Sequence, residues 1–209
     1  MSKILKHSPI EQPLDEVLYT SPHGWITVKK NGEFYYCERK GQDSIAFVLF
    51  ATNLEDHKRI GVVREYKSPI GIPLITAFGG SIDDEKYHEN LYTLVIDEVL
   101  EESGFRVSEK DIVYYGKVYV STQMNQYCHL FAVSVDKFVQ GLRTTENPLE
   151  LQSVIEWLTL PEVFKLEDWK AILITAKRMA EEKGMIRIIP INEVQNSSSQ
   201  TINEQEETA

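Results

Sequence analysis

Apolar and polar positions along the chain alternate or cluster in ways that predict strands separated by helices. Continuous apolar runs indicate strands buried on both faces, and alternating runs of branched and aromatic residues indicate strands with one solvent face. The strands expected from these patterns cover residues around 17–21 and then 24–30, 33–39, 44–52, 59–66, 112–120, 126–135 and 153–160, with a possible last strand at 186–191. Strands mixed with helices in this order predict an α/β fold.

Two longer segments have the apolar spacing of helices that pack one face against a sheet. These are residues 88–103 and residues 166–184, the second ending at Gly184, and Pro161 suits the first turn of a short helix between them. The Gly- and Pro-rich segment 68–86 is expected to be a loop with one short strand inside, and the polar segment 135–151 a loop. Trp157 and Trp169 are expected in the core.

The two ends of the chain differ from its middle. Asn31-Gly32 between two strand-like runs is typical of a tight hairpin, so residues 1–43 are predicted to form a small antiparallel β unit. Trp25, Tyr35 and Tyr36 in this unit either pack between strands or stack on a ligand's base across a dimer interface. Residues 44–191 form the predicted main domain. Residues 192–209 contain no aromatic and no basic residue, which predicts a disordered tail.

Composition and charge restrict the class of partner. The net charge is −10 and the pI about 5.0, so the surface repels phosphate backbones and nucleic-acid binding is not expected. A small anionic substrate remains compatible, because a bound cation inverts the local field. The N-terminus lacks a signal-peptide pattern, and no run approaches the length of a membrane span. With only two cysteines, read as reduced structural thiols, these features predict a cytoplasmic protein with no membrane partner.

Negative charge is concentrated at the end of the first predicted helix. Glu98, Glu101 and Glu102 have the spacing that places side chains on one helical face, and no Lys or Arg is interleaved with them. Like charges, and anions at a helix C-terminus, are both unfavourable unless a cation binds. The helix carries either a solvated acidic face or a site for a hard cation such as Mg²⁺ or Mn²⁺, which prefers oxygen ligands.

The residues on both sides favour the cation site. Gly79-Gly80 follows a strand-like segment, and the run Glu98-Val99-Leu100-Glu101-Glu102-Ser103-Gly104-Phe105 ends at a glycine. This run resembles the second half of the Nudix hydrolase box completely. Glu89 and Gly80 match its first half, with three extra residues between them. The arginine of the family's box, which pairs with a box glutamate, is Asp97 here; Arg64, Lys67 or Arg106 could supply the missing cation.

A second resemblance narrows the group within that family. The stretch VREYKSPIG (63–71) and the segment LEDWKAILITAKRM look like parts of ADP-ribose pyrophosphatases, with Lys67 in place of an arginine. The resemblance implies a Nudix α/β/α sandwich with a mixed sheet, plus the small N-terminal antiparallel β unit. It also implies a homodimer formed through that unit.

The same resemblance implies the residues of the site. Glu98, Glu101 and Glu102 would be catalytic metal ligands for Mg²⁺ or Mn²⁺, with the carbonyl of Gly79 as a further ligand. Arg64, Lys67, Gly79 and Gly80 would bind the substrate. The catalytic base would lie on the later loop, with Glu150 preferred over Glu146.

These implications leave more than one function open. The first is hydrolysis of the pyrophosphate bond in a nucleoside diphosphate linked to another moiety, with ADP-ribose or a nucleotide sugar as the expected small-molecule partner. The alternative, based on Asp97, Lys67 and the three-residue insertion, is a Nudix-fold binding or sensing module with weakened catalysis. A further option is another Nudix substrate class, such as a capped RNA end or a coenzyme A derivative.

Overall fold

The computed structural model describes residues 14–41, 43–52, 58–67, 69–136, 139–145 and 148–187. Its strands are β1 Glu16–Thr20, β2 Ile26–Asn31, β3 Phe34–Arg39, β4 Ser44–Thr52, β5 Lys58–Lys67, β6 Ile72–Thr76, β7 Phe78–Ser81, β8 Ile112–Ser121, β9 Met124–Ser134 and β10 Val154–Leu158. Its α-helices are α1 Glu85–Glu89, α2 Leu91–Ser103, α3 Pro148–Leu151, α4 Leu160–Val163 and α5 Trp169–Glu182. Every strand joins one sheet of mixed direction.

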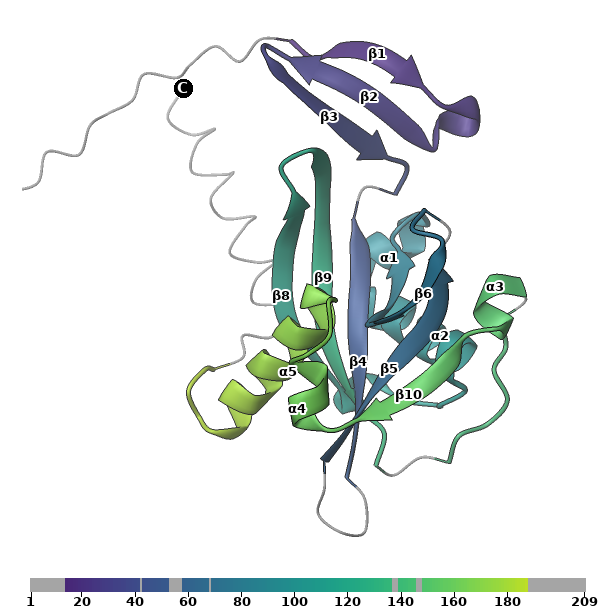
Figure 1. Cartoon of the computed structure of the whole chain (residues 1–209), viewed down its shortest axis with the longest axis vertical. Helices are drawn as coiled ribbons and strands as arrows, with labels where there is room; N and C mark the ends of the chain where they lie inside the picture. Colours follow the sequence, from purple (N-terminus) through teal and green to yellow (C-terminus); the bar gives the residue numbers. More distant parts are fainter. Residues whose placement is uncertain are drawn as a thin grey trace, which may run out of the picture.

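Strand β4 lies at the centre of that sheet (Figure 1). It pairs in parallel with β9, and in antiparallel with β7 along its first half and with β5 along its second half. The continuous apolar run of this strand is fully buried from Ile45 to Leu49. A strand with neighbours on both edges and helices over both faces has no solvent side, which explains the absence of alternation in its sequence.

Two helical layers cover the sheet, as the α/β/α prediction requires (Figure 1). On one face α2 packs through Leu94, Val95 and Val99 in a core with Phe47 and Phe131. On the other face, Ala171 and Ile174 of α5 pack with β-strand residues such as Val48, Val62 and Leu130. The predicted fold class, a mixed sheet between helices with a small antiparallel β unit at the N-terminus, is confirmed.

Several predicted boundaries differ from the structure. The segment 68–86 contains two strands, β6 and β7, and the predicted helix 88–103 is divided at Asn90, whose side chain caps α2 by accepting from the N–H of Tyr92 at 2.9 Å. The predicted loop 135–151 contains α3. Residues 186–187 are not in a strand, and the rest of the expected last strand lies outside the described residues, as does the tail 192–209.

The N-terminal strands form the expected antiparallel unit. Strands β2 and β3 are joined by a two-residue turn in which Gly32 has φ 58°, and β3 contacts the main sheet at Cys37 opposite Met124 of β9. Trp25 and Tyr35 are 49% and 58% exposed, so strand packing does not bury them. The division into domains at residue 43 and the dimer stay predictions.

In the described part of the chain, no helix is both long enough and apolar enough to cross a membrane.

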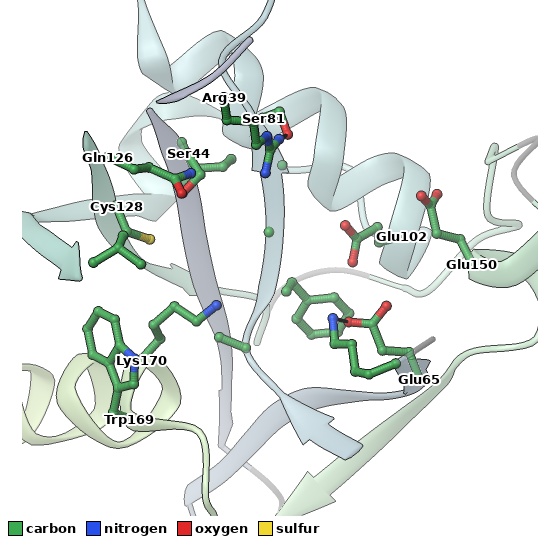
Figure 2. A pocket seen from close by; sticks show the side chains of 17 residues that line it. Arg39, Ser44, Glu65, Ser81, Glu102, Gln126, Cys128, Glu150, Trp169 and Lys170 are labelled. Carbon is green, nitrogen blue, oxygen red and sulfur yellow. Dashed lines mark hydrogen bonds and ion pairs between the residues drawn. The ribbon is translucent and has the colours of Figure 1, made fainter. Parts of the chain in front are cut away.

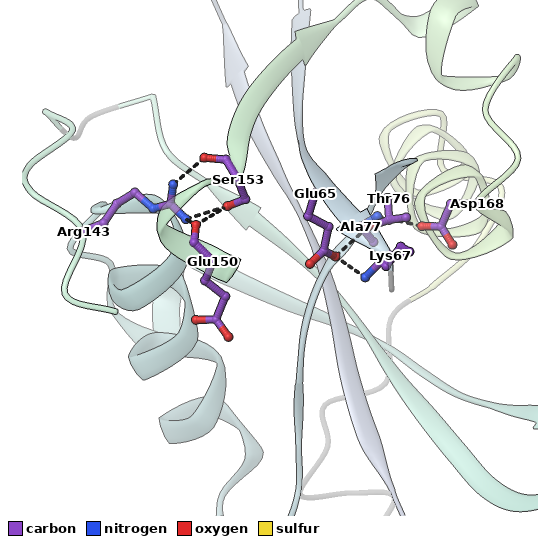
Figure 3. Close-up of polar contacts among 8 residues, drawn as sticks. All are labelled: Glu65, Lys67, Thr76, Ala77, Arg143, Glu150, Ser153 and Asp168. Carbon is purple, nitrogen blue, oxygen red and sulfur yellow. Dashed lines mark hydrogen bonds and ion pairs between the residues drawn. The ribbon is translucent and has the colours of Figure 1, made fainter. Parts of the chain in front are cut away.

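Asp168 connects the beginning of α5 to the sheet. Its carboxylate accepts from the N–H groups of Lys170 and Ala171 at 3.4 and 3.3 Å, which caps the helix. It also accepts from the N–H of Ala77 at 2.6 Å, at the break between β6 and β7 (Figure 3). One side chain therefore satisfies donors of two elements that are far apart in the sequence.

We expect Asp168→Ala to lower the free energy of unfolding by about 1–2 kcal/mol, because a helix cap and a link to the sheet are lost together. Urea denaturation followed by circular dichroism measures this change. Asp168→Asn keeps a capping oxygen and should lose less, and Glu167→Ala on the adjacent exposed residue is the control. Equal stability of Asp168→Ala and the natural protein would show that this link contributes nothing.

Candidate active site

A pocket of about 340 Å³ opens where α2, α3 and the start of α5 meet the sheet (Figure 2). Strands β4, β5 and β7 form its floor, and β8 and β9 contribute to one wall. Its charged lining residues are Arg39, Glu65, Lys67, Glu102, Glu150 and Lys170. Acidic and basic side chains thus share one cavity, which suits an anionic ligand bridged by a cation.

Of the three predicted helix carboxylates, Glu102 is buried and lines this pocket, whereas Glu98 is half-buried beside Gly80 and does not line it. Burial raises the pKa of Glu102 to about 9, with Glu98, Glu150 and Glu65 adding repulsion, and Glu102 is only 8% exposed. Burial, followed by repulsion from Glu101 and Glu150, raises the pKa of Glu98 to about 7. The raised pKa values favour the protonated forms of these two carboxyl groups, Glu102 above all, and a bound cation would favour their ionised forms.

The glycines of β7 allow this close approach. A Cβ atom built on Gly80 would overlap the Glu98 carboxyl group, and one built on Gly79 would lie 2.7 Å from the carbonyl oxygen of Ile45. The N–H of Gly79 also donates to the Glu102 carboxyl group, which lowers the pKa of Glu102 but less than burial and the neighbouring carboxylates raise it. Both predicted glycines therefore lie in the site, and their missing side chains leave room for the glutamates and β4.

Glu150 faces the same cluster from α3, as Figure 2 shows. Arg143 fixes this short helix by donating to the carbonyl oxygens of Glu150 and Ser153 at 2.6 and 2.8 Å (Figure 3). Thr145 donates to the Glu150 carboxylate. The structure thus brings the predicted base to the pocket, whereas Glu146 lies outside the described residues.

Of the two basic residues predicted to bind the substrate, only one lines the pocket. Lys67 lines the pocket and is ion-paired with Glu65, two residues before it on the same face of β5 (Figure 3). Arg64 points to the other side of that strand, does not line the pocket, and is ion-paired with Glu156 at 2.7 Å. Arg39 and Lys170, which the sequence did not single out, line the pocket instead.

Asp97 does not line the pocket. It accepts a hydrogen bond at 3.0 Å from the hydroxyl of Tyr87 on α1, so its side chain joins the two helices. Asp97 therefore adds a carboxylate beside the acidic cluster and does not form a wall of the cavity.

The oxygen donors present suit a hard divalent cation. Mg²⁺ commonly uses one or two carboxylates and completes its shell with water and phosphate oxygens. Glu102, which is buried, and Glu98, which is half-buried, supply that number of carboxylates, while Glu101 is exposed. In the described part of the chain, no group of three or more His, Cys, Asp or Glu side chains is arranged to hold a metal ion. A site here would thus depend on other oxygens, such as a backbone carbonyl or the substrate.

Sequence reasoning missed part of one wall. Trp169, expected in the core, is 40% exposed and lines the pocket, so the core assignment is wrong. Trp169 is the first residue of α5, directly after the capping Asp168. A residue at the start of a helix lies next to a loop, so its side chain can remain accessible to solvent although it is apolar. Gln126 also lines the pocket, and nothing in its local sequence marked it.

Comparisons with known proteins show the fold. No protein-family model and no curated protein matches the chain. A solved structure described as an ADP compounds hydrolase superposes with a TM-score of 0.61 and 14% identity, covering 84% of this chain and 96% of that one. The NUDIX domain of Shewanella oneidensis NrtR, complexed with ADP-ribose, superposes with a TM-score of 0.51 and 18% identity, covering 66% and 86%. The chain therefore has a Nudix-like fold.

Proposed function

We propose that this protein hydrolyses the pyrophosphate bond of a nucleoside diphosphate linked to another moiety, with ADP-ribose or a nucleotide sugar as substrate. The observation that carries the proposal is the buried Glu102, which lies with Glu150 in a pocket that also contains Lys67 and Lys170, and which has the half-buried Glu98 as its neighbour on the same helix. Buried carboxylates with strongly raised pKa values in a pocket are typical of functional sites. The hydrolase and the ADP-ribose complex among the structural neighbours support the same substrate class.

Each residue has a role that its position supports. Glu98 and Glu102, joined by Glu101 at the exposed end of the cluster, would hold Mg²⁺ or Mn²⁺. Lys67, Lys170 and Arg39 would bind and orient the diphosphate. Glu150 would accept the proton of the attacking water, because it faces the cluster from α3. When bound, the divalent cation supplies charge neutralisation and lowers the pKa of a coordinated water.

A binding or sensing module with weakened catalysis is the second function. Asp97 favours it, because that side chain bonds to Tyr87 and no arginine occupies its place in the box. In this case the pocket would bind the same class of nucleotide derivative without efficient turnover. We further propose a homodimer formed by the N-terminal unit and a cytoplasmic location.

Hydrolysis of ADP-ribose with Mg²⁺ or Mn²⁺ separates the two functions. We expect the natural protein to turn over at about 1 per second or faster, and Glu102→Gln to lose about 100-fold or more, because one metal ligand is lost. Coupled phosphate release measures both rates, with Glu109→Gln on the exposed surface as the control. Turnover only after Asp97→Arg would favour the binding module, and no turnover by any variant would refute hydrolysis of ADP-ribose.

The raised pKa values predict how metal-free stability depends on pH. A carboxyl whose pKa rises from 4.5 to about 9 on folding makes the native state bind more protons between these values, so stability falls as pH rises through this window. Glu102→Gln removes the titration. We compare the free energy of unfolding of Glu102→Gln with that of the natural protein. We expect the difference in favour of the variant to increase from pH 5 to pH 9 by at least about 1.4 kcal/mol, the value of one pKa unit.

Urea denaturation in EDTA at several pH values measures this difference. Adding Mg²⁺ at pH 8 should raise the melting temperature of the natural protein and not that of Glu102→Gln, since the cation binds the ionised carboxylates of the native state. A constant difference across pH, together with equal Mg²⁺ effects on both proteins, would refute the assignment of Glu102.

A further inference from the structure

Gln126 is a buried residue whose side-chain amide faces the pocket. It lies on β9, is 5% exposed and lines the cavity. Among the described residues its side chain makes no hydrogen bond, and Figure 2 shows its amide directed toward the cavity. A glutamine amide has donors and an acceptor, and here they are accessible from the cavity, where a ligand could pair with them. The most direct reason for keeping such a group at a pocket wall is a ligand that completes its hydrogen bonds.

Gln126 has polar lining residues, among them Ser44 and Arg39, on one side and apolar or aromatic ones on the other (Figure 2). Cys128 lies two residues further along β9 and therefore on the same face, and Val120 of β8 lines the same wall. Trp169 reaches this wall from the start of α5. A buried amide among apolar and aromatic side chains is the usual composition of a small-molecule subsite, in which the polar group fixes orientation.

This wall is separate from the acidic part of the pocket. Figure 2 places Gln126, Cys128 and Trp169 on one side of the cavity and Glu65, Glu102 and Glu150 on the other, with the Lys170 side chain extending between them. A diphosphate held near Lys170 and the carboxylates would direct one of its two substituents toward Gln126. That substituent is expected to be planar, because an indole ring and an apolar wall suit a flat ring.

On the basis of the proposed pyrophosphate hydrolysis, we propose that Gln126 and Trp169 form the nucleobase subsite of this pocket. Trp169 stacks on the base, which every nucleobase allows. Gln126 pairs its amide N–H and C=O with a donor and an acceptor that lie side by side on the base edge. Gln126 therefore determines which base is accepted, and Trp169 supplies affinity for all bases.

Four substrates that differ only in the base test this subsite: ADP-, GDP-, UDP- and CDP-glucose. We expect the natural protein to prefer one of them in kcat/KM, and Gln126→Leu to reduce kcat/KM for that one by about 10- to 100-fold, so that the preference is lost. Trp169→Ala should weaken all four by similar factors of about 10-fold. Gln123→Leu, in the exposed turn that joins β8 to β9, is the matched control and should change nothing.

A charge-changing variant gives a directional test. Gln126→Glu presents two acceptors, which match the adjacent N1–H and N2–H donors of guanine and leave an unpaired acceptor against the other bases. We expect the ratio of kcat/KM for GDP-glucose to that for ADP-glucose to rise by about 10-fold. A preference that Gln126→Leu and Gln126→Glu both leave unchanged, or equal rates with all four substrates in the natural protein, would overturn the proposal while hydrolysis stands.

Binding separates failure of this proposal from failure of the proposed function. Titration calorimetry with AMP, GMP, UMP and CMP reports base recognition without hydrolysis. Base-selective binding that Gln126→Leu abolishes would support the subsite even if no pyrophosphate were cleaved. Absence of binding and of turnover with all four bases would overturn the subsite as well as the hydrolase.

Discussion

The carboxylates of α2 impose the constraint on which the rest of the site depends. Glu98 and Glu102 face each other and Glu150 in a place where water screens their charges poorly, so their ionised forms repel. The core interactions of Val95 and Val99 hold the helix against the sheet in spite of this repulsion. This repulsion lowers the stability of the native state, and a bound cation would offset it.

The opposite wall depends on a different interaction. Asp168 bonds to the N–H of Ala77 and caps α5, so the beginning of that helix is fixed relative to the strand break before β7. Trp169 and Lys170 follow directly and lie at the pocket. The glycines of β7 contact Glu98 and Glu102 on one side of this short strand. Ala77, directly before β7, bonds to Asp168 at the start of α5. The four residues of β7 therefore position both halves of the cavity.

Sequence reasoning found the features that are local in the chain. The continuous apolar run of β4, the hairpin at Gly32 and the acidic helix next to paired glycines each carry their physical reason within about ten residues. Gln126, Arg39 and Trp169 come to the pocket through pairing of distant strands and through the start of α5, and their own neighbours in sequence do not reveal this. The same limit on sequence reasoning applies to Arg64 and Lys67. Their side chains lie on opposite faces of β5, and only the assembled sheet shows that the face of Lys67 lines the pocket.

Negative charge at the end of α2 is not balanced on the helix itself. The last turn of α2 contains no basic residue, and Asp97 adds a carboxylate that bonds to Tyr87. The positive charge comes instead from Arg39, Lys67 and Lys170, which belong to three different elements of the pocket wall. A diphosphate between these cations and the carboxylates would experience attraction from one side and need a metal ion on the other. The positive charge of the pocket therefore lies on its walls and not on the helix that carries the glutamates, where it would attract an anionic ligand directly.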